Sequence, residues 1–401
     1  MNKIFTSLIN WVKSHWRGLI ITLLVVALAT VTLSLQLSSL VPGQNKFETQ
    51  TLQELTAFPA PWHRAVNAPY MIIAYLFGAI SGDHLYGARV ASVMFGLAAS
   101  ALMYYIIRTW FNSKVAIIGT LLFVTSSWLL HTTHLATPLI MLVFGPLLAV
   151  APLAWFMRTK KYKTLSFMTL AICLGIAAYT PYMLWLVAVA LGIIIYYEKD
   201  LLSKVKTWQL VTAASIYSIL LMPLLISLSR FPGQSIELLG FSKSLPSIGG
   251  YFSHLIQIIT SLFLRSPALP EMRIGHLPDL EIFSAAMLIL GIYYLVQRSA
   301  SKKSIVLFAA FIIMLIVLPF SPNYVMNSVV LLPLVYIVVI TGIVELINQW
   351  FTYFPRNPLA RNVGIALLVF SISITCAYHL ENYFVAWPNV PETKSVYVVK
   401  S

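Results

Sequence analysis

The sequence predicts an all-α, polytopic membrane protein with about eleven transmembrane helices and interfacial helices in two long outer loops. Apolar residues make up 59% of its 401 residues and charged residues only 9%, whereas soluble domains carry roughly a quarter charged residues. The apolar runs are continuous and about 17–25 residues long, which suits helices that cross a hydrocarbon core of about 30 Å. A membrane β-barrel would instead alternate apolar and polar residues.

The spans can be placed in order along the chain. A first apolar run from Gly18 to about Leu40 follows a basic N-terminus and has no convincing cleavage site, so we expect an uncleaved first span. Two shorter apolar pieces, Pro69–Ile80 and Tyr251–Leu264, are predicted to lie in the membrane interface. The other predicted spans are 87–107, 115–133, 138–157, 165–179, 181–197, 209–229, 281–297, 304–320, 325–348 and 362–379.

The basic residues predict the orientation. If the N-terminus is cytoplasmic, each inner segment is short and carries Lys or Arg, as the positive-inside rule requires. The C-terminus is then extracytoplasmic, and we expect the membrane to be a bacterial cytoplasmic membrane. The net charge of +14 is explained by these loops, so a nucleic-acid partner is not expected. The outer parts of one transmembrane domain (residues 1–401) are a first loop at 41–86, a long loop at 230–280 and a tail at 380–401.

Most of the acidic residues fall in the predicted outer segments, so a carboxylate-based active site would lie on the outer face. Glu48 lies a few residues beyond the first span and is the candidate catalytic base, because partial burial raises the basicity of a carboxylate. Lys46 beside it could hold a phosphate. The alternative interpretation is that these are solvated loop residues.

Two histidines, His131 and His134, are three residues apart and would share one face of a helix at the outer end of a span. They could contact a substrate, assist proton transfer or bind a metal, or they could simply be polar residues at a helix end. The sequence has no cysteine or acid near them, so we predict no zinc site. Nothing in the sequence supports a divalent cation or another cofactor.

Further cations are predicted on the outer side. Arg89 lies just inside a span, where a charge is costly unless it is paired, so it is a candidate functional residue. Arg and Lys suit an anionic lipid phosphate by charge and geometry, although their side chains could also extend to lipid headgroups. The other members of this outer set are His63, Arg64, Arg265, Arg273 and His276.

Several short segments occur in a characteristic order: Phe47-Glu48, Asn67-Ala68-Pro69-Tyr70, Gly87-Ala88-Arg89, Tyr179-Thr180-Pro181-Tyr182, Pro278-Asp279 before Gly291, and Leu332-Pro333 before Gly342. This layout resembles the GT-C superfamily of membrane glycosyltransferases. It is most similar to the protein O-mannosyltransferases and the bacterial lipid A aminoarabinose transferases. The resemblance spans nearly the whole chain, and the order and spacing of the segments carry most of its weight.

The resemblance implies an inverting transfer of a hexose or pentose from a polyprenyl-phosphate donor to a lipid, glycan or protein acceptor. It implies that Glu48 is the base, and that Lys46, Arg89, Arg273 and His276 contact the donor phosphate. His63, Arg64, His131 and His134 are the expected substrate contacts. The chain departs from the family pattern at the usual catalytic Asp, which is Phe47, and at a second acidic position, which is Leu139.

These departures sustain a second hypothesis of a different class. The chain could be a catalytically inactive lipid-binding protein, a subunit of an envelope assembly or a carrier of lipid-linked sugars. The predicted spans are nearly free of ionisable residues at mid-span depth, which disfavours the carrier. Both an enzyme and an inactive relative would bind polyprenyl phosphate, but only the enzyme would turn over its sugar-linked form.

Overall fold

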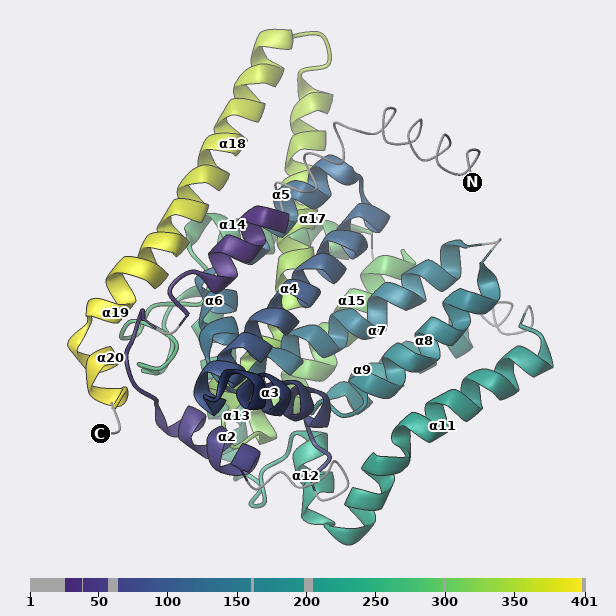
Figure 1. Cartoon of the computed structure of the whole chain (residues 1–401). Helices are drawn as coiled ribbons and strands as arrows, with labels where there is room; N and C mark the ends of the chain where they lie inside the picture. Colours follow the sequence, from purple (N-terminus) through teal and green to yellow (C-terminus); the bar gives the residue numbers. More distant parts are fainter. Residues whose placement is uncertain are drawn as a thin grey trace, which may run out of the picture.

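The computed structural model describes residues 26–37, 39–56, 64–159, 162–197, 205–298 and 301–398. Within these ranges the secondary structure is helical, and the β-type pairing is an isolated antiparallel bridge between Gln44 and Val398. The predicted all-α fold class is therefore confirmed. Figure 1 shows the helices as long, tilted rods, with short helices gathered at one end of the molecule.

The polytopic character is also confirmed. Six stretches of the described residues could cross a membrane by length and composition, if α5 (Ser113–Thr125) and α6 (Ser127–His134) are taken as one span with a 59° bend. The number eleven stays a prediction. The other five stretches are α4 (His84–Trp110); η1 (Pro138–Ile140) with α7 (Met141–Arg158); α11 (Thr207–Arg230); α16 (Tyr324–Asn327), η3 (Ser328–Leu331) and α17 (Leu332–Tyr353); and α18 (Pro358–Glu381), η4 (Asn382–Ala386) and α19 (Trp387–Asn389).

The remaining predicted spans and both predicted interfacial segments are also helical where the structure describes them. The start of the first predicted span lies outside the described residues, and residues 26–34 are helical. The shorter apolar helices are α3 (Ala68–Ser81), α8 (Lys163–Ala177), α9 (Met183–Tyr197), α13 (Ile248–Phe263), α14 (Ile282–Gln297), and α15 (Lys302–Val317) with η2 (Leu318–Phe320). Three short helices, α2 (Lys46–Thr56), α12 (Gly233–Leu239) and α20 (Pro391–Val396), are more polar.

Parts of the predicted outer loops lie together. In Figure 1, α2, α3, α12 and α13 gather at the lower end of the molecule, with α19 and α20 at its lower left. The turn from α17 to α18, which is predicted to be cytoplasmic, lies at the opposite end. Which end faces the cytoplasm stays a prediction.

Local sequence explains where several helices begin. The Asp83 carboxylate accepts hydrogen bonds from the backbone N–H groups of Leu85 and Tyr86, which caps the start of α4. The Ser126 hydroxyl accepts one from the N–H of Leu129 and caps α6 at the bend after α5. Such caps satisfy N–H groups that have no partner inside the helix.

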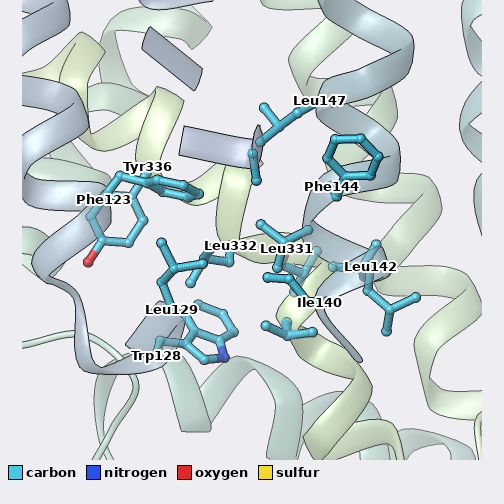
Figure 2. Packing of buried hydrophobic residues seen from close by; sticks show 14 of the residues in the cluster. Phe123, Trp128, Leu129, Ile140, Leu142, Phe144, Leu147, Leu331, Leu332 and Tyr336 are labelled. Carbon is cyan, nitrogen blue, oxygen red and sulfur yellow. The ribbon is translucent and has the colours of Figure 1, made fainter. Parts of the chain in front are cut away.

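The core around this bend is apolar and fully packed. Figure 2 shows side chains from α5, α6, η1, α7 and the start of α17 converging there, among them Phe123, Leu129, Ile140 and Leu332. The Phe123 and Tyr336 rings meet edge to face with centroids 5.8 Å apart. This packing fixes the position of η1, which carries one wall of the candidate site.

Two glycines allow a close contact between α14 and α17. A Cβ placed on Gly291 of α14 would lie 2.1 Å from the Val338 carbonyl oxygen of α17. A Cβ on Gly342 of α17 would lie 2.1 Å from the Met287 carbonyl oxygen of α14. The two backbones can therefore touch only because both positions lack side chains, which is a common way for membrane helices to associate.

Candidate active site

A cavity of about 620 Å³ opens among the gathered short helices. Its walls come from α2, residues 64–67, η1, α12 and residues 321–327. This volume lies within the usual range for small-molecule sites, about 300–1,000 Å³. The amide and hydroxyl side chains on its wall include Gln50, Thr51, Asn67, Thr137, Ser242 and Asn327.

One face of α2 lines the cavity. Phe47, Thr51 and Glu54 follow one another at helical spacing, and all three face the cavity. Leu139 of η1 also lines it. The two positions at which the resemblance implies acids, now Phe47 and Leu139, therefore open onto the same space.

Three charged side chains meet at the cavity wall. Arg64 Nη1 lies 2.9 Å from Glu54 Oε1, and Arg64 Nη2 lies 3.4 Å from Glu237 Oε1. The Glu54 side chain is 18% exposed and the Glu237 side chain 43%. Burial raises the pKa of the Glu54 carboxyl above its ordinary value, and this effect outweighs the opposing attraction of Arg64. The cavity therefore holds a desolvated carboxyl group beside a guanidinium.

The backbone that carries Arg64 is held in place by two neighbouring elements. The Ala65 N–H donates to Gln234 Oε1 at 3.1 Å, and the Asn67 N–H donates to the Tyr179 carbonyl at 2.8 Å. Because Gln234 lies on α12, the first of these bonds ties the segment to the helix that carries Glu237. Arg64 is thus fixed between α2 and α12.

Two cavity residues have left-handed backbone conformations that residues other than glycine rarely adopt. Asn67 has φ of 59° and Tyr182 has φ of 67°, and a non-glycine residue held there costs roughly 1–3 kcal/mol. The Tyr182 hydroxyl donates to Ser321 Oγ at 2.8 Å and accepts from Asn327 Nδ2 at 3.0 Å. This network fixes Tyr182 on the wall, and strain of this kind clusters at functional sites.

Glu48 lies elsewhere, in a fully buried ion pair. Its Oε1 accepts hydrogen bonds from Arg89 Nε at 3.1 Å and from the Ala136 N–H at 3.0 Å. Its Oε2 accepts from the Asn45 N–H at 3.2 Å and from Arg89 Nη2 at 3.3 Å. Glu48 is 0% exposed and Arg89 5% exposed, and neither lines the large cavity. The charge that Arg89 brings into α4 is therefore neutralised inside the protein.

The two predicted histidines do share a face, and it packs against the C-terminal tail. The Tyr383 ring lies 4.7 Å from the His131 ring and 5.0 Å from the His134 ring, and Trp387 lies 4.6 Å from His131. Both histidines line a separate void of about 20 Å³ together with Arg89, which is room for about one water molecule. Within the described residues, no three His, Cys, Asp or Glu side chains are placed to hold a metal.

The other predicted cations have partners away from the large cavity. Lys46 pairs with Glu271 at 3.3 Å, and the buried Arg273 pairs with Asp279 at 2.8 Å. His276 Nδ1 lies 2.8 Å from the Ser266 carbonyl oxygen. His63 lies outside the described residues. Among the predicted site residues that the structure describes, Arg64 is the member that lines the large cavity.

Sequence reasoning missed most of the cavity's polar wall. Glu54 and Glu237 looked like ordinary loop carboxylates, and Lys243 was not singled out, yet all three line the cavity. The spacing from Phe47 to Glu54 was a usable signal, because it places both residues on one face of a helix. For Glu237 and Lys243 we find no comparable local signal.

Part of the chain is similar to a known protein family. Residues 70–233 match the family model of dolichyl-phosphate-mannose-protein mannosyltransferases. A search of curated proteins gave no match. The predicted resemblance to membrane glycosyltransferases of the GT-C superfamily is thereby confirmed over this part of the chain.

Solved structures extend the likeness to nearly the whole chain. ArnT from Cupriavidus metallidurans bound to undecaprenyl phosphate superposes with a TM-score of 0.58 at 11% identity, over 93% of this chain and 76% of ArnT. The oligosaccharyltransferase AglB from Archaeoglobus fulgidus, in complex with an inhibitory peptide and a dolichol-phosphate, superposes with a TM-score of 0.56 at 13% sequence identity. That match covers 96% of this chain and 56% of AglB. The chain therefore has the fold of GT-C membrane glycosyltransferases.

Proposed function

We propose that this protein transfers a sugar from a polyprenyl-phosphate donor to a hydroxyl-bearing acceptor in the large cavity. The single observation that carries the proposal is that Phe47 and Leu139 line this same cavity. These are the positions that the family resemblance assigns to acids. This observation supports the cavity as the active site of a chain whose fold matches transferases solved with polyprenyl phosphates.

The chemistry of the wall supports a sugar and a phosphate as ligands. Amide and hydroxyl groups suit sugar hydroxyls, and Asn67 Oδ1 and Thr137 Oγ1 are buried without hydrogen-bond partners in the described part of the chain. Arg64 and Lys243 are the cations that line the cavity among the described residues. A guanidinium or ammonium group can hold a phosphate by charge and hydrogen bonding.

The donor-phosphate role predicted for Lys46, Arg89, Arg273 and His276 has less support. None of the four lines the large cavity, whereas Arg64 and Lys243 do. We therefore assign the donor phosphate to Arg64 and Lys243.

The test is a transfer assay on the full chain in lipid nanodiscs. Undecaprenyl-phosphate hexoses and pentoses would be offered with lipid and peptide hydroxyl acceptors, and released undecaprenyl phosphate would be measured. We expect turnover with at least one donor, and loss of it in Leu139→Trp, which puts a larger side chain on the cavity wall. Ile219→Trp is the matched control, because Ile219 on α11 is 69% exposed and lies outside the cavity wall.

The second candidate, an inactive lipid-binding protein, is favoured by the missing acids at Phe47 and Leu139. An inactive protein would bind polyprenyl phosphate but would not release it from a sugar-linked donor. Native mass spectrometry with undecaprenyl phosphate would detect the bound lipid. Binding that Leu139→Trp abolishes, together with no release from any donor, would favour this candidate over the transferase.

A further inference from the structure

The transferase reaction needs a group that accepts the proton of the acceptor hydroxyl. Glu48 is poorly suited to this role, because it is held in a buried ion pair with Arg89. A general base must come within hydrogen-bond reach of the proton that it removes. Four hydrogen bonds from Arg89, Asn45 and Ala136 occupy both Glu48 oxygens, and the side chain is 0% exposed. Protonation of Glu48 would also leave the charge of Arg89 buried without its partner.

Glu54 meets the requirements that Glu48 does not. Glu54 lies on the same face of α2 as Phe47, two helical turns further along the chain. Its side chain lines the cavity. Gln50 Nε2 lies 3.3 Å from Oε1 of Glu54, and Arg64 Nη1 lies 2.9 Å from the same oxygen. No hydrogen bond joins Oε2 to any part of the chain that the structure describes, so this oxygen can receive a proton. The pairing with Arg64 also orients the carboxylate.

Glu237 is the other carboxylate on the wall, and it is the weaker candidate. Its side chain is 43% exposed, against 18% for Glu54, and its contact with Arg64 is longer at 3.4 Å. Water solvates the Glu237 side chain more fully, whereas burial raises the pKa of Glu54. Glu237 also raises the pKa of Glu54 by charge repulsion. We assign Glu237 the role of holding Arg64 in place.

We propose that Glu54 is the catalytic base, two turns along α2 from Phe47, the position to which the family resemblance assigns an acid. This inference rests on the proposed transferase function. The acceptor hydroxyl oxygen forms a bond to the anomeric carbon while the bond from that carbon to the phosphate oxygen breaks. The hydroxyl proton passes to Glu54 Oε2, and the electron pair of the broken bond leaves with polyprenyl phosphate. No oxidant, reductant or further reactant is required.

The position of Glu54 has a consequence for the acceptor. Seven residues of helix correspond to about 10 Å along the axis, so the base lies well away from Phe47. The reacting hydroxyl is therefore expected near the C-terminal end of α2, beside α12. Phe47 then provides an apolar surface against which the acceptor or the sugar ring can pack.

The experiment compares wild-type protein with Glu54→Gln, Glu54→Asp and Glu392→Gln in the transfer assay. Glu392 is the matched control, because it is exposed on α20 and lies outside the cavity wall. We expect Glu54→Gln to lower kcat by about 100-fold or more, the usual contribution of a general base, with undecaprenyl phosphate still bound. Glu54→Asp keeps the charge beside Arg64 and should retain intermediate activity. Glu392→Gln should match the wild type.

A pH profile separates a base from a structural residue. The rate of the wild-type enzyme should fall in acid as Glu54 becomes protonated, and this limb should be missing from the residual activity of Glu54→Gln. An active wild type with full turnover in Glu54→Gln would overturn the assignment but leave the transferase function standing. Absence of turnover in the wild type with every donor would instead overturn the transferase function, and the assignment with it.

Discussion

The buried pair of Glu48 and Arg89 predicts that Glu48→Gln is chiefly a stability variant. The substitution keeps the size of the side chain but removes its charge, so the Arg89 guanidinium stays 5% exposed beside a neutral amide. Removing one partner of a buried ion pair costs about 3–5 kcal/mol. The same variant also tests Glu48 as a base, because a base would lose transfer activity without a loss of stability.

This loss of stability can be converted into a change in melting temperature, Tm. With an unfolding entropy of about 2 cal/mol/K per residue, a loss of about 4 kcal/mol across 401 residues lowers Tm by about 5 °C. The assay is thermal unfolding of purified protein in detergent, followed by size-exclusion chromatography of the heated samples. Glu392→Gln, which removes an exposed carboxylate, should leave Tm unchanged.

A double variant sharpens the test. Glu48→Leu with Arg89→Leu removes both charges and should be less destabilised than either single leucine variant, because no unpaired charge stays buried. If Glu48→Gln melted like the wild type and yet lost transfer activity, the structural role would be refuted. Glu48 would then be the base.

Three further predictions concern other parts of the molecule. Gly342→Val should lower Tm by several degrees in the same assay, because its Cβ would lie 2.1 Å from the Met287 carbonyl oxygen and would force α14 and α17 apart. Arg273→Met alone should destabilise by about 3–5 kcal/mol, whereas Arg273→Met with Asp279→Leu should cost less, as measured by Tm. The pKa of the Glu54 carboxyl is raised in the folded protein, so the folded state favours the protonated form. The stability that this preference contributes is fully present below pH 4.5, the ordinary pKa, and is lost as the pH rises through the raised pKa. The Tm of Glu54→Gln should therefore rise relative to the wild type between acid and neutral pH, and a constant difference would contradict the raised pKa.

The sequence by itself determined the helical elements. Continuous apolar runs predicted helices that the structure contains, including the short segment at Pro69–Ile80 that became α3. Composition is enough for this, because in lipid a chain must satisfy its backbone hydrogen bonds within each helix. The cost of burying Arg89 also predicted correctly that it needs a partner.

The tertiary structure alone decided which charges pair and which remain available. Glu48 and Arg89 were predicted as separate site residues, 41 positions apart, and the fold joins them in one ion pair. Pairing across that distance depends on how α2 docks on α4, and no local pattern encodes it. The same docking turns Glu54 toward the cavity, where Arg64 meets it. Local sequence thus places side chains on a helix face, and only the packing of helices decides what that face meets.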